Sequence, residues 1–281
     1  MAAADVTLST PPVRRARPRG GRVAPFGFGL LAATYGGVII LLPISALIWT
    51  AQGLGLDGIW DTLSAPDARA AFALTIACSL IVVVINAIFG TMLAWVLERD
   101  EFWGKRYVDA VIDLPFALPT IVAGLTLIAL YGQRSPIGIN IAYTRMAIVV
   151  ALAFVTLPFV VRSVQPVLRE LDRESEQAAM SLGASPFVTF RRVILPALVP
   201  AIASGCSLAF AKAVGEFGSL VIITGNIPNR TEVSSVYIFG RIESGDPAAA
   251  SAVAVVLLLI SFGLLLTIGV VRHYATRYDR A

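Results

Sequence analysis

The sequence predicts an all-α, polytopic membrane protein with six transmembrane helices. Of the 281 residues, 57% are hydrophobic and only 14% are charged, and the mean hydropathy is +0.80. A soluble domain of this length needs more polar surface. Six apolar runs each approach the roughly 20 residues that an α-helix needs to cross a hydrocarbon core of about 30 Å. These runs do not alternate apolar and polar residues, which argues against a transmembrane β-barrel.

The first segment, residues 1–25, is rich in arginine, proline and glycine and is predicted to be a disordered basic cytoplasmic arm. The apolar run that follows, about 26–49, is too long for the core of a secretory signal peptide, so we expect an uncleaved span. The remaining runs are approximately 70–97, 110–131, 146–164, 197–223 and 249–271. Prolines inside the runs do not forbid helices, because neighbouring helices can satisfy the freed carbonyls. Residues 26–275 are therefore expected to form one transmembrane domain, followed by a cytoplasmic tail, 276–281.

Lysine and arginine are unevenly divided between the two predicted sides of the membrane. Sixteen of the 22 lie on the side that contains both termini, five lie on the other side, and Lys212 lies inside the fifth run. Because cytoplasmic loops are enriched in Lys and Arg, both termini are predicted to be cytoplasmic, in a multi-pass protein of the plasma or inner membrane. This distribution also accounts for the net charge of +4, so nucleic acid is not expected as a partner.

No motif in the sequence indicates an enzyme. Neither lysine, Lys105 or Lys212, completes a phosphate-binding loop of the pattern G-x-x-x-x-G-K-[ST]. The only histidine, His273, has no nearby Cys, Asp or Glu with which to bind a metal. Both cysteines, Cys78 and Cys206, lie in apolar runs and are expected to be small buried side chains. We expect no catalytic residue, cofactor or metal, and an energy source that is either an ion gradient or another polypeptide.

The stretch EQAAMSLGASPFVTFRRVILP, residues 176–196, is too polar for a span and too apolar for an ordinary loop. Asp172 is placed to cap a short acidic helix that Gly183 ends, and Ser185-Pro186 is placed to start a second helix. The first helix carries a stripe of small residues, and its acids would be repelled by anionic lipid. Docking on another protein is therefore favoured over the alternative, a helix lying on the lipid headgroups.

QAAMSLG, followed nine residues later by VILP, resembles the cytoplasmic loop motif of ABC-importer permeases, E-A-A-x-x-x-G-x9-I-x-L-P. The matching residues are Ala178, Ala179, Gly183, Leu195 and Pro196. Gln177 stands where the family has Glu, with Glu176 beside it, and Val193 replaces Ile. In that family the loop is the coupling helix, which fits a groove on the ATP-hydrolysing subunit. The resemblance thus implies an ATPase-coupling role for the loop at about 170–196, including Glu176 and Gln177.

Three longer stretches narrow the resemblance. DLPFALPTIVAGLTL (113–127), LPFVVRSVQPVLRELDRESEQAA (157–179) and FAKAVGEFGSLVIITGNIP (210–228) resemble the T-type permease of sulfate/thiosulfate importers, and the last is also similar to molybdate permeases. The resemblance implies the type I ABC-importer permease fold and translocation of sulfate or thiosulfate by alternating access, with molybdate or tungstate as the alternative.

The same resemblance implies several partners. They are a second permease subunit, related but not identical, two copies of an ATP-binding subunit, an extracytoplasmic sulfate-binding protein and membrane lipid. The alternative from a different class is an anion transporter driven by a gradient and acting alone. Six spans without a visible internal repeat fit that alternative poorly.

Lys212 and Glu216 place two charges inside the fifth run. A lysine at the centre of a span costs about 2.5–3.5 kcal/mol, so contact with lipid is not expected. At i and i+4 the two side chains share a helix face and can partly neutralise each other. Two interpretations remain open: a buried structural pair, or a polar lining of the translocation pathway.

Three further polar residues are expected to be structural. Asn86, in the second span, is a candidate for a hydrogen bond to another helix. Asp109 and Asp113 precede or enter the third span from its cytoplasmic side, where a helix N-terminus accommodates acids.

Overall fold

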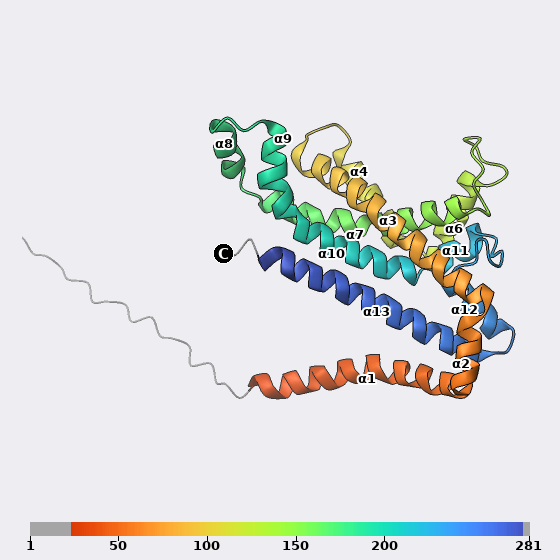
Figure 1. The fold of residues 1–281 in the computed structure, drawn as a ribbon. Coiled ribbons are helices and arrows are strands. Elements are labelled where there is room, and N and C mark those ends of the chain that lie inside the picture. Colours follow the sequence, from red (N-terminus) through yellow and green to blue (C-terminus); the bar gives the residue numbers. More distant parts are fainter. Residues whose placement is uncertain (1–23, 278–281) are drawn as a thin grey trace, which may run out of the picture. The chain divides into compact units, whose positions relative to one another are not determined.

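The computed structural model describes residues 24–277, and all the regular structure in that range is helical (Figure 1). Two compact units separate, Met1–Ser45 and Ala46–Ala281. Most of α1 (Ala24–Gln52) belongs to the first unit and forms the first predicted span as one helix despite Pro43. The basic arm, except for Ala24 and Pro25 at the start of α1, lies outside the described residues.

Within residues 24–277, five helices are long and apolar enough to cross a membrane. These are Gly29–Gln52, Pro66–Arg99, Arg145–Glu170, Pro186–Val214 and Pro247–Val270. They correspond to the first, second, fourth, fifth and sixth predicted spans, and they confirm the prediction of a multi-pass helical protein.

The third predicted span, 110–131, is not one helix. It consists of α4 (Lys105–Ile112), α5 (Leu114–Ala117) and α6 (Thr120–Tyr131). Leu118 has extended backbone angles, φ −85° and ψ 133°, because the ring of the following Pro119 disfavours a helical residue before it. The prediction was right about the apolar run and wrong about its continuity.

The fifth predicted span, 197–223, is also interrupted. α10 (Leu195–Val214) ends at Gly215, and α11 (Gly218–Ile223) begins three residues later. Glu216 lies in the interruption, and its Oε1 accepts a hydrogen bond from the backbone N–H of Ser219 at 3.1 Å. Because this carboxylate satisfies one of the free N–H groups at the start of α11, the chain can restart a helix there.

α3 (Pro66–Arg99), α7 (Arg145–Glu170) and α10 form the centre of the second unit. They meet around Val160, where a Cβ on Gly205 would lie 2.8 Å from Cα of Val160, so glycine permits this close approach. Asn86 of α3 donates to Oγ1 of Thr156 at 2.9 Å and to the carbonyl of Ala153 at 3.2 Å, both on α7. The predicted hydrogen bond between helices is confirmed.

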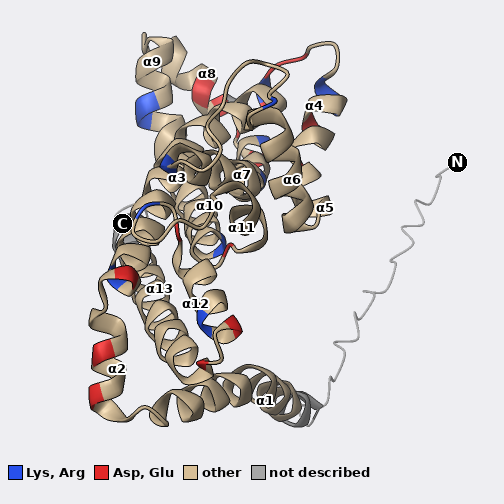
Figure 2. Ribbon diagram, turned by 90° about the vertical axis from the view of Figure 1, so that its right-hand side faces the viewer, with Lys and Arg blue, Asp and Glu red and all other residues tan. Residues whose placement is uncertain are grey.

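Short helices lie at both ends of this unit. α4, α8 (Arg173–Ser181) and α9 (Pro186–Thr189) lie at one end, called the α8 end, and α2 (Gly55–Ser64) and α12 (Ser234–Glu243) lie at the other (Figure 1). Acidic residues lie on α2 and α8 (Figure 2). Arg191 and Arg192 follow shortly after α9 in the sequence. The last helix, α13 (Pro247–Arg277), packs on α10 and α12 and continues into the segment predicted as a tail.

The two cysteines differ in burial. Cys78 is buried, as predicted, whereas Cys206 is only half-buried, and both are free thiols. His273 falls in the part of α13 whose side chains are outside the described residues.

Candidate functional site

The loop at the α8 end begins with the predicted acidic helix. Oδ1 of Asp172 accepts a hydrogen bond from the backbone N–H of Glu174 at 2.9 Å and caps α8. Glu174 and Glu176 occupy the first turn, where a carboxylate suits the positive end of the helix dipole. The predicted start of this helix is confirmed.

Gly183 ends α8 in the left-handed region, with φ +86°. Its N–H donates to the carbonyl of Met180 at 2.9 Å, and the N–H of Ala184 donates to the carbonyl of Ala179 at 3.1 Å. A Cβ built on Gly183 would meet no atom of this chain within 4 Å. The backbone conformation, and not crowding within the chain, therefore explains the glycine.

The second arm of the loop starts at Ser185, whose Oγ accepts from the N–H of Val188 at 3.4 Å, with Pro186 as the first residue of α9. A five-residue π-helix, η1 (Phe190–Ile194), then joins α9 to α10. Pro196 lies in the first turn of α10. Because a proline clashes with the carbonyl four residues earlier in a regular helix, the wider turn of η1 accommodates it. The sequence did not predict this continuous connection from the loop into a long apolar helix.

The predicted coupling residues divide by exposure. Gln177, Ala178, Gly183 and Pro196 are exposed, whereas Glu176, Ala179 and Leu195 are half-buried. Large apolar side chains are exposed beside them, with exposed fractions of 48% for Met180, 89% for Leu182 and 70% for Phe187. Apolar side chains gathered on a polar end of a molecule are typical of a protein contact.

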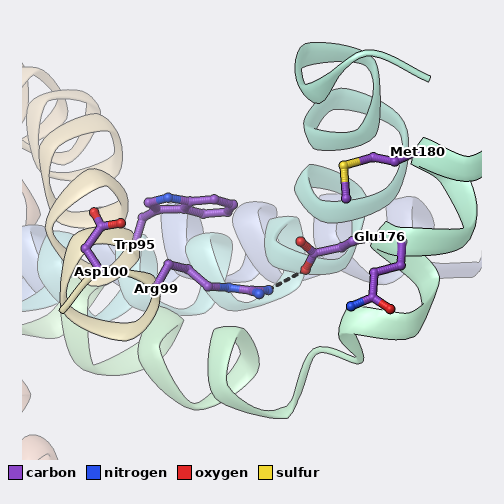
Figure 3. A pocket seen from close by; sticks show the side chains of 6 residues that line it. Trp95, Arg99, Asp100, Glu176 and Met180 are labelled. Carbon is purple, nitrogen blue, oxygen red and sulfur yellow. Dashed lines mark hydrogen bonds and ion pairs between the residues drawn. The ribbon is translucent and has the colours of Figure 1, made fainter. Parts of the chain in front are cut away.

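Glu176 points into the molecule. Its Oε1 lies 2.5 Å from Nη2 of Arg99, at the end of α3, and the two side chains are only 16% and 10% exposed. Figure 3 shows the Trp95 ring beside Arg99, whose guanidinium carbon lies 5.5 Å from the ring centroid. The lining residues of the cavity there, about 320 Å³, are Trp95, Arg99, Asp100, Glu176, Gln177 and Met180. Arg99 and Trp95 could not be predicted from the sequence, because no spacing rule connects Arg99 with Glu176, 77 positions further along the chain.

Two further sets of ion pairs hold the α8 end together. Arg169 of α7 pairs with Glu98 of α3 at 2.7 Å. Arg162 of α7 pairs with Asp109 and Asp113, each at 2.6 Å, and thereby ties the start of the broken third helix to α7. Burial alone would raise the pKa of Asp109, but hydrogen bonds from Arg162 and Gln165 outweigh it and hold that pKa below its usual value. The prediction that Asp109 and Asp113 are structural agrees with these contacts.

The intramembrane charges do form a pair. Nζ of Lys212 lies 2.7 Å from Oε2 of Glu216, and the exposed fractions of the side chains are 36% and 1%. The other carboxylate oxygen accepts from both the N–H and the hydroxyl of Ser219, at 3.1 and 3.0 Å. The Glu216 carboxylate is therefore buried, whereas the Lys212 side chain is partly exposed.

The two helix breaks lie against each other. A Cβ on Gly218, the first residue of α11, would collide with Oγ1 of Thr120 and lie 2.9 Å from the backbone N of Ile121, at the start of α6. A Cβ on Gly124 of α6 would lie 2.7 Å from the carbonyl oxygen of Ser219. Irregular backbone at membrane depth is tolerated where protein or a polar cavity surrounds it.

Solved structures show which proteins share this fold. The chain superposes with a TM-score of 0.71 on a bacterial alginate ABC transporter, at 15% identity over 86% of this chain and 91% of the other. It superposes with a TM-score of 0.56 on the MetNI methionine ABC transporter, at 21% identity over 79% of this chain and 96% of the other. The fold is that of the ABC-importer permeases, as predicted.

The particular family follows from the sequence comparisons. Residues 87–279 match the model described as binding-protein-dependent transport system inner membrane component, and the chain belongs to this family. A relative in Nephroselmis olivacea, named probable sulfate transport system permease protein cysT, is 48% identical over 82% of this chain and 84% of its own. The sulfate transport system permease protein CysT of Synechocystis is 46% identical, covering 86% and 87%. The protein of that name in Escherichia coli is 43% identical, covering 82% and 86%.

Proposed function

We propose that this chain is the transmembrane permease subunit of an ATP-driven ABC importer of sulfate or thiosulfate. The observation that carries the substrate is the relatives' shared name, sulfate transport system permease, at 43–48% identity over more than four-fifths of the chain. The same names favour sulfate over molybdate or tungstate. The permease hydrolyses no ATP itself, since a separate ATPase subunit of the complex does so.

The loop from Asp172 to Pro196 supports the coupling role. Its exposed apolar side chains, Met180, Leu182 and Phe187, give an ATPase subunit a surface to bind. Its second arm continues through η1 into α10 as one continuous helical segment, Pro186–Val214. Movement of the docked loop would therefore turn or shift α10, and alternating access would follow from that motion.

Lys212 lies in the last turn of this segment and Glu216 just beyond it, and both are proposed to line the translocation pathway. The Lys212 side chain is partly exposed, so its charge can attract a passing oxyanion, and Glu216 keeps that attraction weak. A deep binding pocket is not expected, because one neutralised lysine cannot replace the hydration of a divalent anion. Tight recognition is assigned to a separate extracytoplasmic sulfate-binding protein.

The proposed complex contains a second, related permease, two ATP-binding subunits and the binding protein, in the plasma or inner membrane. Arg99, Lys105, Arg106, Arg169, Arg191 and Arg192 belong to segments at the α8 end. Because positive residues stay inside, we assign the α8 end to the cytoplasm. Both termini are assigned there as well, from the Lys and Arg residues near them in the sequence.

The complex purified with its native companions, in proteoliposomes, tests the proposal. Uptake of radiolabelled sulfate should require ATP and the binding protein, and excess thiosulfate should compete better than molybdate. The chain reconstituted alone should move no sulfate under an ion gradient. Gradient-driven uptake by the chain alone, or preferred uptake of molybdate, would overturn the assignment.

A further inference from the structure

We infer that Arg99 is a positioning residue for the coupling loop and that Glu176 is its internal partner, not a contact with the ATPase subunit. The inference rests on the proposed function, since it concerns how the proposed coupling loop is held. It reverses the role expected for Glu176 from its place beside the loop motif.

The geometry of the pair supports an internal role. The 2.5 Å contact between Arg99 and Glu176 is mostly enclosed, with side-chain exposures of 10% and 16%. Trp95 covers the guanidinium at 5.5 Å from its ring centroid, which adds a cation–π attraction. Gln177, at the position of the motif's glutamate, is exposed instead. A carboxylate already engaged in this way is not free to meet an outside partner.

The last turns of α3 contact three parts of the loop and its approach. Arg99 holds α8 through Glu176, Glu98 holds the end of α7 through Arg169 at 2.7 Å, and Trp95 meets the ring of Phe190 in η1 edge-on at 5.7 Å. Both arms of the loop therefore contact the C-terminal end of α3. A displacement of the docked loop must move α3 as well as α10.

The orientation of α8 depends on its tertiary contacts. The helix has nine residues, and none whose side chain the structure describes is buried. An isolated helix this short is not stable in water, so its orientation comes from tertiary contacts. Leu171, before α8, packs against the core formed by α3, α7 and α10, and α8 itself contacts mainly the short elements α9 and η1 of the same loop and, through Glu176, the end of α3. The Arg99–Glu176 pair is the ion pair that joins α8 to the end of α3, and we expect it to fix the direction in which Met180 and Leu182 face.

The test compares four variants with the parent chain: Arg99→Ala, Glu176→Arg, the exchange Arg99→Glu with Glu176→Arg, and the control Glu101→Gln. Glu101 belongs to an ion pair with Lys105 in the next loop, but its side chain is 90% exposed. The full chain, with Cys78→Ala and Cys206→Ala, carries a spin label at Leu182→Cys in lipid nanodiscs. The second readout is the number of ATP molecules hydrolysed per sulfate imported by the assembled complex.

Arg99→Ala and Glu176→Arg should each sharpen the spectrum of the label and raise the ATP cost per sulfate roughly tenfold, because one partner of an enclosed charge pair is lost. The exchange should restore both readouts, and Glu101→Gln should change neither. A label as immobile in Arg99→Ala as in the parent would overturn the inference. An exchange as defective as Glu176→Arg alone would do the same, because it would show that Glu176 itself meets the ATPase.

Failure of the proposed function is distinguishable from failure of this inference. The label spectrum needs neither ATP nor sulfate, so it decides the internal pair even if the parent complex imports no sulfate. A parent complex that imports sulfate, together with an unaltered label, would reject the inference and leave the proposed function standing.

Discussion

Arg162 donates two parallel hydrogen bonds to Asp113, from Nε to Oδ1 at 2.8 Å and from Nη2 to Oδ2 at 2.6 Å. Asp113 is the residue between α4 and α5, so the guanidinium clamps a helix break to the continuous helix α7. Two parallel bonds need the planar fork of arginine. The same group also reaches the carboxylate and carbonyl of Asp109, on the turn before. One side chain therefore positions the whole entry of the broken third helix.

Replacing Arg162 should loosen this entry. Arg162→Ala is expected to cost about 1.5–3 kcal/mol, the range for hydrogen bonds to charged groups, and Arg162→Lys should recover only part of it. The measurement is the temperature at which half of the detergent-solubilised protein leaves the monodisperse peak in size-exclusion chromatography. Arg106→Ala, an exposed arginine of the adjacent α4, is the control and should leave that temperature unchanged. An equal size-exclusion temperature for Arg162→Ala and Arg106→Ala would contradict the stabilising role of Arg162.

The lowered pKa of Asp109 predicts a direction of pH dependence. Because the folded state binds the proton more weakly than the unfolded chain, this carboxylate stabilises the fold above its ordinary pKa of about 4. That contribution is lost as the pH falls through the lower, folded value. Thermal stability of the parent should therefore drop between about pH 4 and more acidic conditions, and Asp109→Asn should reduce the drop. An equal loss of thermal stability at acidic pH in Asp109→Asn and in the parent would contradict the stabilising role of the ionised Asp109.

The Lys212–Glu216 pair should respond asymmetrically to substitution. Lys212→Met leaves a carboxylate that is 1% exposed without its cation, so it should cost about 3–5 kcal/mol. The double variant Lys212→Met/Glu216→Gln should recover much of that loss, since no buried charge remains. Sulfate uptake by the stable double variant then separates the two roles. Loss of uptake supports a pathway lining, and normal uptake means the pair is only structural.

Gly183 should be sensitive to backbone conformation and to bulk separately. Gly183→Ala strains a residue at φ +86° by about 1–2 kcal/mol, whereas Gly183→Asn tolerates that region. If the loop docks on an ATPase, Gly183→Trp should uncouple ATP hydrolysis from uptake while the protein still inserts, because its side chain points away from this chain. ATPase activity and uptake are measured on the same proteoliposomes. Normal uptake in Gly183→Trp would contradict docking at this point.

Gly218 should not tolerate a side chain. Gly218→Ala would push the start of α11 away from α6, at a cost of about 1–3 kcal/mol for overpacking. Thr120→Ala should not rescue it, because the backbone N of Ile121 would still lie 2.9 Å from the new Cβ. Gly240→Ala in α12 is the matched control, since its Cβ would meet nothing within 4 Å. Expression and thermal stability of the three variants decide this prediction.

Much of the molecule could be predicted from local properties of the chain. Each residue carries its own transfer free energy into a bilayer, so summing along the chain located the apolar runs. Caps and turns also depend on neighbours in sequence, which is why Asp172, Gly183 and Ser185 end or begin helices where expected. The spacing of the motif likewise pointed to the loop for which we propose the coupling role, and Lys212 and Glu216 pair as their i, i+4 spacing predicts.

Only the tertiary structure decided which distant groups meet. Hydropathy does not reveal the breaks at Leu118 and Gly215, because it sums transfer free energies and carries no information on backbone angles. Nothing local connects Arg162 with Asp113, or Arg99 with Glu176, since an ion pair depends on where the packed helices bring each charge. The sequence by itself therefore determined which segments enter the membrane and where the loop lies. Packing decided how that loop is held, because electrostatic partners are chosen by distance in space.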